Sequence, residues 1–272
     1  MTDLELMRSV ADAYVWHRAL GNTRVQGPHC DFIKDPENPD VWSSNHISQI
    51  TAATDPQINA LMDEMDAQFG YCAHRLAVVD CFTPQRFVAN LAMQDYRELA
   101  PTLQMILVGS LAPTNSPVLD IREPRQDQDW QSVYNLVALD HAEGARSNRT
   151  ALPESVTRGI VAGLRKKSQS CRFFVAYLNG RPSAYGAAVS CPNGLGMVED
   201  LFTLPSCRGR GIASALIHHC IETLRQDQDR IIFLGAHVTE RPKRLYGKLG
   251  FTPLMLTREF LLKPSALGPT GA

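Results

Sequence analysis

Apolar residues in the second half of the chain recur with two spacings, which predict alternating strands and helices. In residues 211–225 they lie three and four positions apart, as on one buried helix face. Further helices are expected over residues 126–141, 153–167 and 242–249. Short apolar runs typical of strands cover residues 118–122, 172–178, 182–190, 196–204, 230–234 and 253–262. Asn179-Gly180 is a hairpin signal between two of these strands. The order predicts an α/β fold with a mixed sheet.

The first half repeats part of this order when it is shifted by 155 residues. An expected helix over residues 56–69 then falls on residues 211–224, and an expected strand over residues 75–79 falls on residues 230–234. Few residues are identical at this offset, so two unrelated α/β segments remain an alternative to a duplication. A proline-containing stretch, residues 112–117, is typical of a linker. We therefore predict two domains, residues 1–115 and residues 116–272.

The composition of the chain is that of a globular protein. The chain has 272 residues, of which 44% are apolar and 20% charged, which excludes a disordered or fibrous protein. The longest uncharged run, residues 99–119, contains three prolines, so no membrane span is expected. The first twenty residues lack a secretory signal, and the seven cysteines form no CxxC pair. These features predict a cytoplasmic protein with reduced thiols.

Charge is divided unevenly between the two halves. Residues 1–120 hold 7 basic and 15 acidic residues, whereas residues 121–272 hold 20 basic and 13 acidic ones. A basic second half suits a polyanionic ligand, although two oppositely charged domains could also simply attract each other. It has no basic stripe with interleaved aromatics, so nucleic acid is not an expected partner.

The most informative segment joins the strand that ends near residue 204 to the helix at 211. Gly209 and Gly211 let the backbone approach a ligand, and the free amides of the helix start favour a phosphate there. Arg208 and Arg210 add positive charge. Position 214 is Ser, so the dinucleotide pattern GxGxxG is absent, and no Walker loop is present either.

Arg208-Gly-Arg-Gly211-Ile-Ala213 resembles the [RQ]-x-x-G-x-[GA] motif with which the GNAT acetyltransferase superfamily binds acyl-CoA. Arg244-Leu-Tyr-Gly-Lys-Leu-Gly-Phe251 is similar to the L-Y-x-x-x-G-F segment of that family, at the expected distance. The resemblance covers residues 118–262 and implies a GNAT-like fold, in tandem with a related fold in the first half. One departure is Thr239, where the family often has Asn.

The resemblance also implies roles for individual residues. Acetyl-CoA would be the cosubstrate, and Tyr246 would lie near its sulfur and act as the general acid, unless it only packs against Phe251. Backbone at Leu201, Phe202 and Thr203 would pair with the pantetheine arm. The pyrophosphate would be held by the loop and helix start, formed by Arg208, Gly209, Arg210, Gly211, Ile212 and Ala213.

Strand alternation places Met197, Glu199 and Leu201 on one face, which the resemblance turns toward the acceptor. Glu199 is therefore the predicted general base, and Asp200 is the second candidate. A surface carboxylate without a catalytic role is the third interpretation.

The sequence argues against a metal and against a second active site. No His or Cys group has the spacing of a zinc site. At the 155-residue offset, Asp55 stands in the place of the phosphate loop and Leu91 in the place of Tyr246. The first domain is therefore expected to be a degenerate GNAT-like copy.

Together these observations predict an acetyl-CoA-dependent N-acyltransferase that acts on a primary amine of a small molecule or peptide, by direct attack in a ternary complex. The alternative is a regulatory module that binds acyl-CoA or a metabolite without turnover. No metal, nucleic acid or membrane partner is expected, and a homodimer is left open.

Overall fold

The computed structural model describes residues 1–113, 117–146, 152–229 and 231–263. Two compact units make up the chain: Met1–Gly21 with Leu103–Leu254, and Asn22–Thr102 with the residues from Met255 onward. This division differs from the expected boundary near residue 115, because packing assigns the N-terminal helix to the first unit and most of the last strand to the second. Part of the expected linker, residues 114–116, lies outside the described residues.

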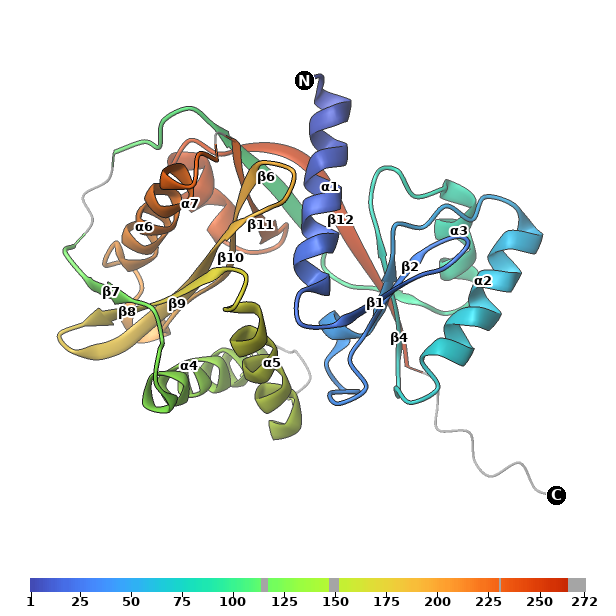
Figure 1. The fold of residues 1–272 in the computed structure, drawn as a ribbon, viewed down its shortest axis with the longest axis horizontal. Coiled ribbons are helices and arrows are strands. Elements are labelled where there is room, and N and C mark those ends of the chain that lie inside the picture. Colours follow the sequence, from blue (N-terminus) through green and yellow to red (C-terminus); the bar gives the residue numbers. More distant parts are fainter. Residues whose placement is uncertain (114–116, 147–151, 230, 264–272) are drawn as a thin grey trace. The chain divides into compact units, whose positions relative to one another are not determined.

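The first unit is built from a mixed sheet and its helices (Figure 1). Its strands are β6 (Thr102–Val108), β7 (Asp120–Arg122), β8 (Arg172–Leu178), β9 (Arg181–Ser190), β10 (Leu195–Thr203), β11 (Ile231–His237) and the start of β12 (Thr252–Leu262). Its helices are α1 (Asp3–Ala19), α4 (Asp127–Arg146), α5 (Glu154–Lys167), α6 (Ile212–Gln226) and α7 (Pro242–Lys248), with a short 3-10 turn, η2 (Pro205–Cys207). Strand order is β7, β8, β9, β10, β11, β6. Strand β10 is antiparallel to β9 and parallel to β11.

The mixed α/β fold confirms the prediction for the second half of the sequence. Asn179 and Gly180 both have left-handed backbones, with φ of 51° and 73°, and turn β8 into β9. Helix α1 and strand β6 were not predicted. The local signals were present, since α1 begins with the capping box Thr2–Glu5 and buries Leu6, Val10 and Tyr14 at helical spacing, and β6 contains the apolar run Met105–Val108.

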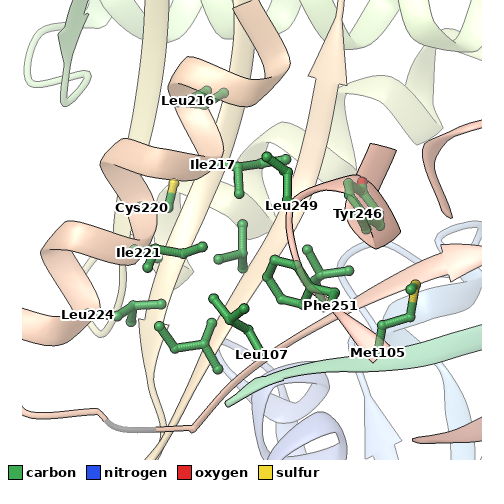
Figure 2. Packing of buried hydrophobic residues seen from close by; sticks show 14 of the residues in the cluster. Met105, Leu107, Leu216, Ile217, Cys220, Ile221, Leu224, Tyr246, Leu249 and Phe251 are labelled. Atoms are coloured by element: carbon green, nitrogen blue, oxygen red, sulfur yellow. The ribbon is translucent and has the colours of Figure 1, made fainter. Parts of the chain in front are cut away.

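The buried face of α6 forms the core of the first unit (Figure 2). Leu216, Cys220 and Leu224 of the predicted apolar stripe are completely buried. Each leucine side chain contributes about 1.5–3 kcal/mol on burial. Gly186 of β9 permits this close packing, because a Cβ there would lie 2.7 Å from Leu201 Cδ2 and 3.3 Å from Leu216 Cδ2.

The second unit has its own sheet and core. Its elements are β1 (Thr23–Gln26), β2 (Asp31–Lys34), η1 (Trp42–Ser44), β3 (His46–Ser48), α2 (Asp55–Gln68), β4 (Arg75–Val79), α3 (Gln85–Met93), β5 (Arg97–Glu98) and the rest of β12. Strand order is β1, β2, β3, β4, β12, and β5 pairs with β12. The helix expected over residues 56–69 and the strand expected over residues 75–79 are both present. Phe32, Phe69 and Phe87 pack in its core.

The sequence predicted no membrane span and reduced cysteines. Across the described ranges, no helix combines the length and the apolar character needed to cross a bilayer. The seven cysteines all lie in the described residues, and none of them forms a disulfide.

Candidate functional site

Strands β10 and β11 pair along only part of their length. The parallel register runs from Leu195↔Ile231 to Val198↔Leu234, whereas β10 continues to Thr203. Between Glu199 and Phe202, one extra residue in β10 shifts its register with β9. Asp200 lies in this bulge with φ of 54°, a conformation that costs a non-glycine residue on the order of 1–3 kcal/mol. The edge of β10 beyond the bulge is therefore not paired with β11.

The bulge also changes which face of the sheet the side chains after it occupy, compared with the alternation predicted from the sequence. Leu201 packs with Val198 and Leu216 on the α6 face of the sheet. Phe202 lies on the other face, where its ring centroid is 5.6 Å from that of Tyr185. The expectation that Leu201 shares a face with Glu199 is wrong, because the extra residue at Asp200 interrupts strict alternation.

The segment between β10 and α6 brings backbone amides to the open edge. Gly209 and Gly211 both adopt left-handed conformations, with φ of 75° and 77°. The Gly211 carbonyl accepts the first helical hydrogen bond, from Ala215 N–H. The amides of the first turn of α6 therefore lack intrahelical partners, and the helix dipole adds positive potential there. A Cβ at Gly209 would meet nothing within 4 Å, so the loop is open to a ligand on that side.

Arg208 supports this loop in a way that the sequence did not reveal. Its guanidinium donates two hydrogen bonds of 2.6 Å to the Glu143 carboxylate on α4 and one of 3.0 Å to the Thr203 carbonyl. Much of its charge is therefore engaged by the protein itself. Arg210 is exposed in the same loop.

A cavity of about 760 Å³ lies at this loop. Among the residues predicted to bind the cofactor, all but Arg210 line it, and so does Tyr246 of α7. Glu199 is not among the described residues that line the cavity. The lining also contains polar or charged side chains that sequence reasoning did not assign to the site, namely Asp140, Glu143, Ser214, Glu240 and Arg241, together with Thr239, which stands where the family often has Asn. The helical pattern around residue 140 contains no motif that would have singled out the two on α4.

Tyr246 is buried, with 5% of its surface exposed. Desolvation, together with the negative charges of Glu199 and Glu240, raises the pKa of its phenol above the ordinary value. Tyr246 is thus protonated at neutral pH. Its ring centroid lies 6.3 Å from that of Phe251, so the side chain also packs in the core (Figure 2).

The chemistry of the cavity fits coenzyme A. Unpaired amides at a helix start suit a pyrophosphate, and the unpaired edge of β10 suits the amide groups of a pantetheine arm. Apolar lining residues such as Leu201, Ile212 and Ile217 suit its hydrocarbon portions.

No comparable loop is formed by the predicted counterpart in the second unit. Asp55 begins α2 there and forms an ion pair with Arg86, so the helix start carries a carboxylate. Leu91, at the position corresponding to Tyr246, is fully buried in the core. In the part of the chain that is described, three or more His, Cys, Asp or Glu residues nowhere gather in a group that could hold a metal ion.

Residues 130–251 match a family model described as "Acetyltransferase (GNAT) family". No curated protein shows a significant sequence match to the chain.

Solved structures resemble the chain in fold at low sequence identity. A GCN5-related N-acetyltransferase from Kribbella flavida gives a TM-score of 0.67 at 13% identity, with 96% of each chain covered. A conserved protein of unknown function from Staphylococcus epidermidis gives 0.65 at 12% identity, covering 90% of this chain and 95% of that chain. A tandem GNAT protein from the clavulanic acid biosynthesis pathway gives 0.59 at 14% identity, covering 89% of this chain and 79% of that one.

Proposed function

Because residues 130–251 form a domain of the GNAT acetyltransferase family, we propose that this protein transfers an acetyl group from acetyl-CoA to a primary amine of a small molecule or peptide. The GNAT fold supports acyl transfer in general, and the family generally uses acetyl-CoA. The proposed reaction is direct attack of the amine on the thioester within a ternary complex.

One observation carries the proposal: a helix start with unpaired amides and a protonated phenol line the same cavity. The amides belong to the first turn of α6, and the phenol is that of Tyr246. An anion-binding site alone would suit many phosphate ligands. A proton donor in the same cavity suits a ligand whose leaving group needs a proton, as a thiolate does.

Backbone amides bind the cofactor in the proposed mechanism, and one side chain supplies a proton. The amides of residues 209–213 bind the pyrophosphate, and the backbone of residues 201–203 orients the pantetheine arm. Bound acetyl-CoA supplies the activated acyl group as a thioester. Tyr246 donates its proton to the departing sulfur, and its raised pKa keeps this proton in place across the neutral range.

Glu199, the predicted general base, is not among the described residues that line the cavity, but its charge acts on Tyr246. Its carboxylate helps to raise the pKa of Tyr246, which supports a role in keeping the acid protonated. If Glu199 also accepts the proton of the amine, Glu199→Gln should lower the rate most at low pH, where the acceptor is an ammonium, and leave coenzyme A affinity unchanged.

The test is release of coenzyme A thiol from acetyl-CoA in the presence of a panel of primary amines: a diamine, an aminoglycoside, an amino acid and a peptide with a free N-terminus. We expect amine-dependent release together with a stable amide product. Tyr246→Phe serves as the matched control, because it should bind coenzyme A and turn over slowly. Tight acetyl-CoA binding without acetylation of any amine would replace the enzyme by a regulatory acyl-CoA-binding module.

A further inference from the structure

The end of α4 is joined to the loop before α6 (residues 208–211) by one ion pair. Both terminal nitrogens of the Arg208 guanidinium donate to the Glu143 carboxylate, at 2.6 Å each. The Nε atom of the same side chain donates to the Thr203 carbonyl at 3.0 Å. All three guanidinium nitrogens are therefore engaged by the protein, and a two-pronged pair of this kind fixes the relative position of its partners. Arg208 is thus placed to hold the loop on α4.

A row of aromatic rings joins the start of α4 to the same arginine. Successive ring centroids lie 5.8 Å apart from Trp130 of α4 to Phe173 of β8, 5.6 Å from Phe173 to Tyr185 of β9, and 5.6 Å from Tyr185 to Phe202 of β10. All four rings are buried. The guanidinium carbon of Arg208 lies 5.9 Å from the centroid of the Phe202 ring, and a guanidinium is attracted to a ring within about 6 Å. Helix α4 is therefore connected to Arg208 at two points, one near each of its ends.

Helix α4 supplies a part of the cavity wall that contains no residue assigned to the cofactor. Asp140 and Glu143 lie about one turn apart on α4, and both line the cavity. The residues assigned to coenzyme A belong instead to β10, to the loop before α6 and to the start of α6. Tyr246 lines the same cavity, so an amine that attacks a thioester beside this phenol enters the space that α4 borders. The α4 wall is therefore available to the acceptor.

We infer that Glu143 is a positioning residue that couples the binding of the two substrates, because through Arg208 it joins the α4 wall to the loop that holds coenzyme A. The inference rests on the proposed function. When the loop amides hold the pyrophosphate, the loop is fixed, and with it Arg208, Glu143 and the end of α4. The acceptor then meets a wall that is already ordered, so less conformational freedom is lost when it binds. By linkage, the acceptor strengthens coenzyme A binding by the same factor.

Hydrogen exchange of the α4 amides, measured with and without coenzyme A, tests this link before any acceptor is known. In the wild type, saturating coenzyme A should slow exchange around residues 140–143 by roughly fivefold or more, the lower end of common coupling between two sites. Glu143→Gln keeps the length of the side chain and a hydrogen-bonding end but breaks the charged pair, so it should lose most of this protection. Its Kd for coenzyme A, measured by calorimetry, should change by less than roughly fivefold, the reach of an exposed ion pair.

Asp127→Asn is the matched control. Asp127 also lies on α4 and accepts a 2.6 Å hydrogen bond from Arg165, but neither residue is among the described residues that line the cavity. Removal of this pair should leave the effect of coenzyme A on α4 exchange unchanged. Circular dichroism and thermal unfolding show whether each variant is folded.

Kinetics with the most active amine of the panel provides a second test. Glu143→Gln should raise the KM for this amine by roughly fivefold or more and change kcat much less, because the proton donor at the thioester is untouched. Arg208→Gln breaks the same link and should raise this KM to a similar degree. The double variant should be no worse than either single one, because the two residues act as one unit.

Equal protection of α4 by coenzyme A in the wild type and in Glu143→Gln would overturn the inference, and so would a wild type without such protection. Loss of protection in Asp127→Asn would also overturn it, because it would indicate a general weakening of α4. Two results for Arg208→Gln would do the same. A lower amine KM would make Glu143 a direct partner of the ammonium, and a coenzyme A Kd raised roughly tenfold beyond that of Glu143→Gln would make Arg208 a phosphate ligand.

Failure of the inference can be distinguished from failure of the proposed function. If the wild type does not bind coenzyme A, both fail. If coenzyme A binds and protects α4 through Glu143 but no amine is acetylated, the proposed function alone fails. If amines are acetylated and neither α4 exchange nor the amine KM responds to Glu143→Gln, the inference alone fails.

Discussion

Comparison of Gly209→Ala with Gly180→Ala separates the stability lost to backbone strain from the coenzyme A affinity lost at the proposed anion site. Gly209 has φ of 75°, a conformation that L residues rarely adopt, so a side chain is strained there. The strain costs roughly 1–2 kcal/mol. Gly180, in the β8–β9 turn, has φ of 73°, and a Cβ there also meets nothing within 4 Å. Gly180→Ala therefore carries the same strain outside the cavity.

Both variants should lose similar stability, about 2–4 °C in Tm per kcal/mol for a protein near this size. Only Gly209→Ala should weaken coenzyme A binding, because Gly209 lines the cavity and an added side chain there would crowd a pyrophosphate held by the loop. If the displaced pyrophosphate loses one hydrogen bond from a backbone amide, the cost is about 1.5–3 kcal/mol, or roughly ten- to a hundredfold in Kd.

The assay is isothermal titration calorimetry with coenzyme A, alongside thermal unfolding of each variant without ligand. Equal Kd values for Gly209→Ala, Gly180→Ala and the wild type would refute the assignment of this loop to the pyrophosphate. A Tm loss confined to Gly209→Ala would refute the matched strain on which the comparison depends.

Three further predictions follow from the cavity. Tyr246→Phe should lower kcat on the order of ten- to ten-thousandfold and leave acetyl-CoA affinity nearly unchanged, and full turnover by this variant would exclude Tyr246 as the acid. Because burial raises the pKa of the phenol, the kcat of the wild type should not fall between pH 7 and 9 through loss of this proton. Arg208→Ala breaks a half-exposed pair with Glu143, so unfolding should show a loss of only about 0–1 kcal/mol, and a larger loss would contradict this. Titration should find one coenzyme A per chain, unaffected by Asp55→Ala, and two would indicate a second working site.

Local patterns predicted the parts of the site that lie close together in sequence. The apolar stripe of α6, the Asn179-Gly180 turn and the loop with Gly209 and Gly211 all follow from backbone geometry over a few residues. Such features are written in spacing and residue type, so they can be recognised without knowledge of the packing.

The sequence by itself determined an α/β chain with a phosphate-binding loop followed by a tyrosine on a later helix. Tertiary structure alone decided which distant groups face that loop. The pairing of Arg208 with Glu143 and the packing of α1 on β10 join segments far apart in the chain. The bulge at Asp200 reversed the expected faces of the residues after it, because one unpaired residue overrides strand periodicity. Such contacts arise from burial and packing, which no short sequence window records.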